Sequence, residues 1–278
     1  MNAHRADNSN SWKYWAEPLN PDILETLKTR WPKAKLWIED FRVTRITRVR
    51  TSSRYFPEVS NYSRDRPGGY ECNYNVLMHH RWTLHSLKVK VNDSIYTGYA
   101  RLKDVLLSSP NLKVFWSEPL LLPNDHPPDT DRPEPFRVQF SRQEGGEVFP
   151  PLEEIVLRSF EFGNAFQCGI WDWSAIRTLH LRDVYALRLL EATVNLPDIF
   201  KELRDLKFEG ACFPEDSTTE SLWFQTFLEF LGKLPKLRAL KLEGLGSDGA
   251  DGVLNKHIIK RAVRAAGADV EALELDLS

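Results

Sequence analysis

Apolar side chains recur along this chain in a short pattern, Leu-x-x-Leu-x-Leu, which is clearest between Phe149 and Val184. The last two apolar positions of the pattern alternate with polar ones, as in a strand that buries one face. A pattern that returns along a chain is typical of a protein built as a stack of similar units. We therefore predict a repeat fold in which each unit contributes one short strand.

The pattern returns from residue 84 to the end of the sequence and is degenerate at Ser117, which replaces a third apolar residue. The apolar triplets are Leu84/Leu87/Val89, Leu112/Phe115/Ser117, Leu152/Ile155/Leu157, Ile176/Leu179/Leu181, Leu203/Leu206/Phe208, Leu237/Leu240/Leu242 and Val270/Leu273/Leu275. A further strand is predicted at residues 35–38. It follows a helix that begins at Asn20-Pro21, where Asn suits the cap and Pro the first helical position.

Segments with one apolar stripe lie between the predicted strands and predict helices that pack behind them. These segments surround residues 102–106 and cover residues 186–194, 221–231 and 253–266. Strands and helices that alternate in this way predict an α/β solenoid, with a parallel sheet on its concave side and helices on its convex side.

Three segments interrupt the repeat. Residues 1–18 are polar and predict a flexible N-terminal segment, whereas residues 19–278 form one repeat domain with insertions at about 42–80 and 117–148. The first insertion carries a run of arginines, namely Arg42, Arg45, Arg48, Arg50 and Arg54. A solvated surface is the favoured interpretation of this run, and binding of RNA or phosphate is the alternative.

The composition limits the classes of partner and the cellular compartments that we expect for this protein. The chain is 42% apolar and 27% charged, and its formal net charge of −2 provides no general attraction to nucleic acid or anionic membrane. The cysteines, Cys72, Cys168 and Cys212, lack CxxC spacing and predict reduced thiols. Residues 1–10 carry no secretory signal, and no apolar run is long enough to span a bilayer. We expect a cytoplasmic or nuclear protein without a membrane partner.

Residue types that carry chemistry are present, but their spacing does not favour a catalytic or metal site. His79-His80, with Cys72 and His85 nearby, lack the paired spacing of structural zinc ligands. Glu153-Glu154 are adjacent on a predicted strand, so their side chains point to opposite faces. Gly244-x-Gly246-x-x-Gly249 matches part of a glycine-rich phosphate-binding motif, but Asp248 within it would repel phosphate. We therefore predict a protein that is not an enzyme and has no catalytic residue, cofactor or metal.

Polar positions on the concave side of the sheet are the candidate binding surface. The residue between the second and third apolar positions of each repeat gives one row: Lys88, Trp116, Val156, His180, Lys207, Lys241 and Glu274. The next outward position gives a second row: Lys90, Glu118, Arg158, Arg182, Glu209, Glu243 and Asp276. Neighbouring strands lie about 4.8 Å apart, so each row runs as a ladder across the sheet.

The first row is mainly basic, and the second changes from basic to acidic toward the C-terminus. Trp and Arg are frequent anchors of protein interfaces. We predict that a protein partner binds this face, with Trp116, Arg158, His180 and Arg182 at the centre and Lys207 and Lys241 beside them. The alternative is that these positions are polar only because they face water.

Several short segments of the sequence resemble the repeat region of fungal-type F-box/leucine-rich-repeat proteins. They are Ser109–Val114, Phe149–Glu154, Asp172–Asp183 and the opening Leu19–Leu24 with Arg30–Pro32. The resemblance covers roughly residues 19–277. It implies a leucine-rich-repeat solenoid that acts as a protein-interaction module in the ubiquitin conjugation pathway, where the repeats capture the substrate of the ligase.

In that family an F-box before the repeats docks the adaptor of a cullin-type ligase, and this sequence carries no F-box motif before residue 19. The resemblance therefore implies the adaptor as a partner only if an F-box lies outside this chain. The alternative is a truncated or decayed repeat scaffold without a ligase role. The end of the sequence inside the last predicted strand, without a polar cap, favours that alternative.

Overall fold

The computed structural model describes most of the predicted repeat region. The described residues of the 278-residue chain are 25–26, 29–30, 35–43, 77–91, 96–119, 140, 146–162, 168–184, 186–194, 199–210, 217–243, 256–265 and 270–276. The predicted N-terminal segment, the arginine run beyond residue 43, most of both predicted insertions and the glycines of segment 244–249 lie outside these residues.

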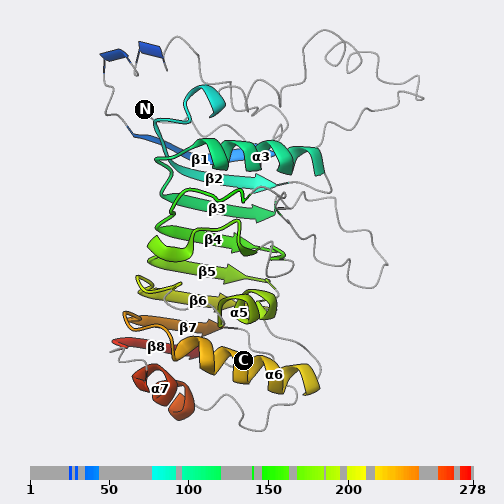
Figure 1. Cartoon of the computed structure of the whole chain (residues 1–278), viewed down its shortest axis with the longest axis vertical. Coiled ribbons are helices and arrows are strands. Elements are labelled where there is room, and N and C mark those ends of the chain that lie inside the picture. The colour runs from blue at the N-terminus through cyan, green and yellow to red at the C-terminus, as the bar shows by residue number, and fades with distance from the viewer. Residues whose placement is uncertain are drawn as a thin grey trace, which may run out of the picture.

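The described strands form one sheet in which every neighbouring pair is parallel and the strands follow one another in chain order. They are β1 (Leu36–Val43), β2 (Leu84–Val91), β3 (Val114–Pro119), β4 (Glu154–Arg158), β5 (Thr178–Arg182), β6 (Asp205–Glu209), β7 (Ala239–Glu243) and β8 (Ala272–Asp276). Each strand therefore begins at the same edge of the sheet, and every connection returns to that edge (Figure 1).

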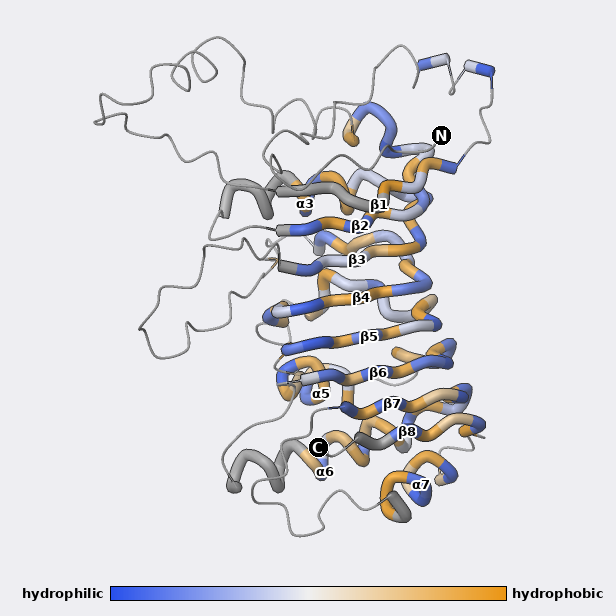
Figure 2. Tube along the Cα trace, turned by 180° about the vertical axis from the view of Figure 1, so that it is seen from behind, coloured by the Kyte–Doolittle hydropathy of each residue, from blue (hydrophilic) through white to orange (hydrophobic). Residues whose placement is uncertain are grey.

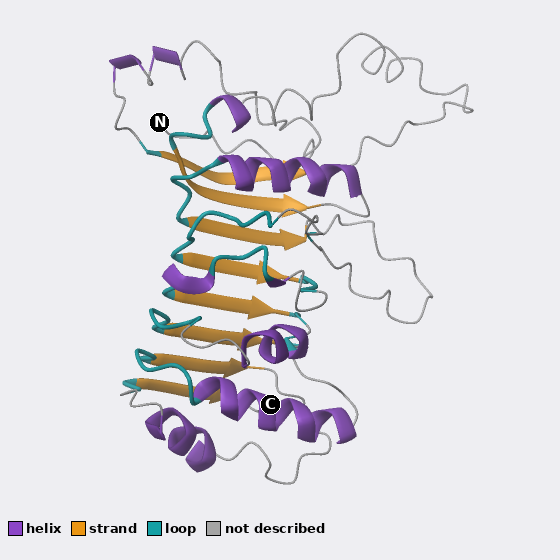
Figure 3. Cartoon of the chain, in the orientation of Figure 1, coloured by secondary structure: helices purple, strands orange, loops and turns teal. Residues whose placement is uncertain are grey.

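The described helices lie on one face of this sheet (Figure 3). They are α3 (Tyr96–Ser108), α5 (Leu187–Val194), α6 (Ser217–Leu231), α7 (Lys256–Ala265) and the short 3-10 helix η3 (Trp173–Ala175). Seen from behind, the strands stand in front and no described helix crosses them (Figure 2). We call this uncovered side the open face. The chain is thus an α/β protein with a single parallel sheet, as the alternation of patterns predicts.

The apolar pattern of the repeats forms the core between the sheet and the helices. The second apolar positions pair in register across the sheet, and six of the seven are almost completely buried: Leu87, Phe115, Ile155, Leu179, Leu206 and Leu240. The seventh, Leu273 of β8, pairs with Leu240 but is only partly buried. Leu102 of α3, Leu190 of α5 and Phe227 of α6 belong to the same buried cluster. The predicted strand pattern is confirmed by this register.

Aromatic side chains fill the core behind β3–β5, where the described chain has η3 in place of a long helix. The cluster contains Phe115, Phe140, Phe149, Phe160, Phe162, Trp171, Trp173 and Phe200, with ring centroids 4.9 to 6.4 Å apart. Asp172 caps η3 by accepting from the backbone N–H of Ser174 at 3.0 Å. Large aromatic rings therefore supply the buried area that a helix supplies elsewhere.

Within the described part of the chain, none of the helices is both long and apolar enough to cross a membrane.

Candidate functional site

The structure brings the six predicted contact residues together on the open face. One row, which we call the central row, pairs in the predicted register: Lys88 with Trp116, Trp116 with Val156, Val156 with His180, His180 with Lys207, Lys207 with Lys241, and Lys241 with Glu274. Every member belongs to a different strand from β2 to β8. The central row exists because each repeat places its polar position at the same point of the strand.

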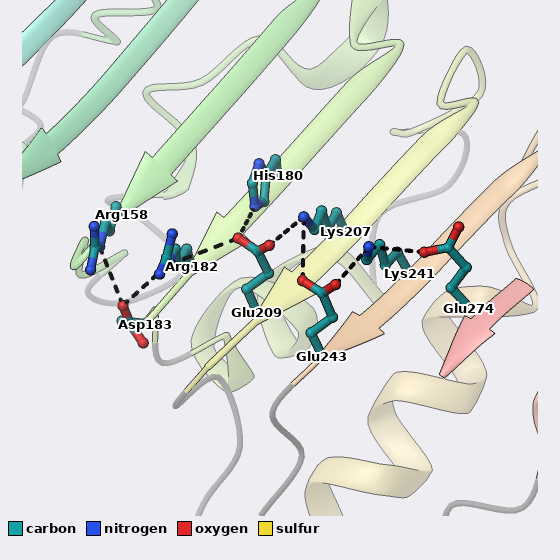
Figure 4. A network of polar contacts seen from close by, with 9 residues as sticks. All are labelled: Arg158, His180, Arg182, Asp183, Lys207, Glu209, Lys241, Glu243 and Glu274. Carbon is teal, nitrogen blue, oxygen red and sulfur yellow. Dashed lines mark hydrogen bonds and ion pairs between the residues drawn. The ribbon is translucent and has the colours of Figure 1, made fainter. Parts of the chain in front are cut away.

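The second predicted row, which we call the outer row, lies two residues further along each strand. Its register pairs are Lys90 with Glu118, Arg158 with Arg182, Arg182 with Glu209, Glu209 with Glu243, and Glu243 with Asp276. The two rows run side by side, so cations of the central row lie next to carboxylates of the outer row (Figure 4).

In the C-terminal half of the open face, cations and carboxylates alternate in a connected chain (Figure 4). Lys207 pairs with Glu209 and, at 3.3 Å, with Glu243. Lys241 pairs with Glu243 at 2.6 Å and with Glu274 at 2.9 Å. The charge of these lysines is therefore compensated on the protein itself, which the basic character of the central row alone does not reveal.

His180 connects this chain to the middle of the sheet. Its Nε2 lies 2.6 Å from Oε2 of Glu209. Burial lowers the pKa of His180 below its usual 6.5, although the hydrogen bond to Glu209 acts in the opposite direction. Near pH 7 His180 is consequently neutral and donates an N–H to the carboxylate. The centre of the row thus carries less positive charge than its residue types indicate.

Glu209 is the residue on which these contacts converge. Burial by itself raises the pKa of its carboxyl, but the contacts with Lys207 and His180 act in the opposite direction, and the pKa is lowered to about 2. The carboxylate remains ionised throughout the physiological range. Glu209 therefore holds His180 and Lys207 in place over the whole physiological pH range.

Two arginines of the outer row share one carboxylate, that of Asp183. Arg158 Nε lies 3.4 Å from Oδ2 of Asp183, and Arg182 Nε lies 3.8 Å from the same oxygen. Arg182 also lies 4.0 Å from Glu209. The Nε of Arg158 is buried and has no hydrogen-bond partner in the described structure, so its pairing with Asp183 is electrostatic. These contacts are longer than those of Lys241, and both arginine side chains remain partly exposed, at 30% for Arg158 and 49% for Arg182.

Asp183 belongs to neither predicted row, and sequence reasoning missed it. It directly follows β5 and has a positive φ of 52°, and the equivalent residues after β4 and β6, Ser159 and Gly210, have φ values of 51° and 68°. The N–H of Asp183 donates to the carbonyl of Glu209 at 2.9 Å, which extends the ladder by one residue. A Cβ built on Gly210 would lie 2.1 Å from Oδ1 of Asp183. Glycine at this position therefore makes room for the carboxylate that holds the two arginines.

Trp116 is half-buried, although an exposed anchor is predicted at this position. Its Nε1 donates to Oε1 of Glu154 at 2.7 Å, and Lys88 Nζ lies 4.0 Å from the centroid of its ring. Among the tryptophans that the structure describes, Trp37 at 55% and Trp82 at 59% are more exposed, and neither is among the predicted contact residues. In the N-terminal half of the open face, Trp116 therefore lies among charged side chains that hold its ring in place.

Where the structure describes them, the other residues singled out by type do not gather into a reactive site. His79 packs edge-on against His80 and lies 3.1 Å from Glu25, while Cys72 is outside the described residues. Glu153 and Glu154 contact different partners, as adjacent strand residues should. Among the described residues, no group of three or more His, Cys, Asp or Glu side chains is placed to hold a metal ion.

Cys168 is a buried thiol. Burial raises its pKa to about 12, so the thiolate, which is the reactive form, is scarcely populated near pH 7.

Comparisons of the chain with models of known protein families, with curated proteins and with solved structures find no match.

Proposed function

We propose that this chain is a non-enzymatic protein-interaction module, built as a leucine-rich-repeat solenoid, whose open face holds the partner. The observation that carries the proposal is the uncovered side of the sheet, on which two registered rows of polar and aromatic side chains cross the strands. A parallel sheet is normally covered on both faces. A face without a helical layer that carries ordered side chains is suited to contact another protein.

The ion pairs on this face favour binding because they fix side chains before a partner arrives. Immobilising a long side chain at an interface costs about 0.5–1.5 kcal/mol. Lys207 and Lys241 are each held by two carboxylates in the free protein. Less freedom remains to be lost when the partner binds.

The centre of contact lies at Arg158, Arg182 and Trp116 rather than at the two lysines. Among the described residues, the guanidiniums of Arg158 and Arg182 are held only by long ion pairs. A planar guanidinium can donate two parallel hydrogen bonds to a partner carboxylate, and Trp contributes a large apolar surface. His180, Lys207 and Lys241 support this centre by maintaining the position of Glu209 and Glu243.

The resemblance of the repeats to F-box proteins suggests the class of partner. In that family the repeats hold the substrate of a ubiquitin ligase, and we propose the same role for the open face here. An F-box supplied outside this chain would connect it to the ligase. Co-purification of a cullin adaptor from the native cell supports this ligase role, whereas partners without the adaptor would indicate a recognition scaffold alone.

The proposal is tested by affinity purification of the wild type and of the Arg158→Glu/Arg182→Glu variant, followed by mass spectrometry. We expect the specific partners of the wild type to be lost from the variant. Arg188→Glu/Arg264→Glu is the matched control because it changes the net charge equally at exposed residues of α5 and α7. An unchanged partner set in the outer-row variant contradicts the proposal.

A further inference from the structure

A separate row of arginines lies at the edge where the strands begin. Arg177, Arg204 and Arg238 directly precede β5, β6 and β7, so they occupy one position of three successive repeats. The N–H of Arg204 donates to the carbonyl of Arg177 at 2.8 Å, and the N–H of Arg238 donates to the carbonyl of Arg204 at 2.8 Å. We call these three residues the arginine edge.

The backbone holds the arginine edge at a fixed spacing. The carbonyl of Arg177 also accepts from the N–H of Asp205 at 3.0 Å, and that of Arg204 accepts from Ala239 at 3.0 Å. The carbonyls of Arg177 and Arg204 are therefore each fixed by two hydrogen bonds. With strands about 4.8 Å apart, the three backbone positions span about 10 Å.

Arg238 is exposed and Arg204 is half-buried at the surface. In the described part of the chain, neither Arg204 nor Arg238 has an ion pair or a side-chain hydrogen bond. Arg177 pairs with Glu153 at 3.1 Å but keeps 53% of its side chain exposed. Lys236, two residues before Arg238, is by contrast held by Glu202 with contacts of 2.7 and 2.8 Å. Lys236 most strongly, and Lys201 and Arg204 in addition, lower the pKa of Glu202, which is consistent with a positive local field.

Acidic residues bound the arginine edge on both sides. Glu153, before β4, and Glu271, before β8, occupy the equivalent position in the flanking repeats. The positive stretch is therefore only three repeats long. A short run of carboxylates matches this length, whereas an extended polyanion such as nucleic acid would meet the flanking acids and a net charge of −2.

We propose that the arginine edge binds a short carboxylate-rich segment of a protein partner. Arg204 and Arg238 supply the principal contacts through charge-assisted hydrogen bonds, and Arg177 extends the site toward β4. The site lies at the beginning of the strands, whereas the outer row lies at their ends. The inference does not depend on the proposed function of the open face.

The test uses the full chain and a fluorescein-labelled peptide of eight glutamates as the probe, with binding followed by fluorescence anisotropy at low salt. We expect binding that weakens as salt rises. Arg204→Glu/Arg238→Glu should bind the probe at least about tenfold more weakly. Circular dichroism checks that this double variant is folded. If the double variant does not fold, the single Arg238→Gln variant, changed at an exposed residue, replaces it and should show a smaller loss of affinity for the probe.

Two controls locate the effect. Lys90→Glu/Arg188→Glu changes the net charge by the same amount away from the edge, and Arg158→Glu/Arg182→Glu removes the centre of the open face; both should keep the affinity of the wild type within about twofold. The proposal is overturned if the wild type does not bind the probe or if either control loses as much affinity as the edge variant. It is also overturned if an eight-nucleotide single-stranded DNA binds more tightly than the peptide.

Discussion

The two sides of the same strands behave in opposite ways. On β5, Leu179 and Leu181 face the helices and are completely buried, whereas His180 and Arg182 face the open side and contact charged groups. Burial of a leucine side chain stabilises the fold by about 1.5–3 kcal/mol, while an exposed ion pair contributes about 0–1 kcal/mol. The comparison indicates that the helix side determines stability, and that the open side is free to serve recognition.

The largest expected effect is on the helix side. Leu181→Ala should lower the free energy of unfolding by about 2–5 kcal/mol, because it leaves a cavity among residues that are fully buried. Leu181→Met, which keeps the volume, should cost less than about 1.5 kcal/mol. Urea unfolding followed by circular dichroism measures both. A loss below about 1 kcal/mol for the alanine variant would show that the core tolerates a gap there.

A smaller effect is expected where the two sides meet, at Gly210. Gly210→Ala places a Cβ 2.1 Å from Oδ1 of Asp183 at a φ of +68°, so it should cost about 1–3 kcal/mol and displace the carboxylate that holds Arg158 and Arg182. Gly146→Ala is the matched control, because its φ is +76° and no atom of the described residues lies within 4 Å of the added Cβ. Equal losses of unfolding free energy in the two variants would exclude a contribution from the contact with Asp183.

The ion pairs of the open side should respond to acid. Because these side chains are partly exposed and water screens their charges, we expect an effect smaller than that of Gly210→Ala. The folded state lowers the pKa of Glu209 from 4.5 to about 2 and that of His180 below 6.5. In both cases the unfolded chain binds the proton more readily as pH falls. The contribution of His180 is therefore present above pH 6.5 and declines below it, and that of Glu209 is lost between about pH 4.5 and 2.

Urea unfolding of the wild type and of Glu209→Gln across this pH range tests the assignment. The variant should lose stability at pH 7 and show a flatter decline between about pH 4.5 and 2, because the carboxyl is absent. Parallel pH profiles for the two proteins would show that Glu209 does not account for the acid response.

The smallest effect is expected for Lys241→Ala. Lys241 contacts Glu243 and Glu274, and these contacts raise its pKa, yet the pair lies in water, where ion pairs are weak. The midpoint of urea unfolding should stay within the error of the wild type. A shift as large as that of Gly210→Ala would mean that the ion pairs themselves hold the sheet together.

The strands and both rows of the open side could be predicted from the sequence, because the alternation of apolar and polar residues is a local signal. Trp116 and His180, for example, lie in the predicted register. The pairing within the rows could not be predicted in the same way. Lys241 contacts Glu274, which is remote in sequence, and the choice among carboxylates depends on side-chain geometry.

The alternation of apolar and polar residues also does not predict the backbone conformation of the turn that follows each strand. Asp183 joins the site only because its backbone adopts a positive φ and because Gly210 leaves space beside it. An Asp and a Gly that each directly follow a predicted strand are the available signal. The arginine edge was also missed, because its residues lie just outside the strands to which the pattern applies. The available signal is that Arg177, Arg204 and Arg238 each directly precede a strand.

The division of tasks between the two sides is tested most directly by one paired measurement on Arg158→Glu/Arg182→Glu. Thermal unfolding and affinity purification are carried out on the same preparation, next to the wild type. We predict an unchanged unfolding midpoint together with the loss of the specific partners. A partner set identical to that of the wild type, from a variant with an unchanged midpoint, would contradict the assignment of recognition to the open side.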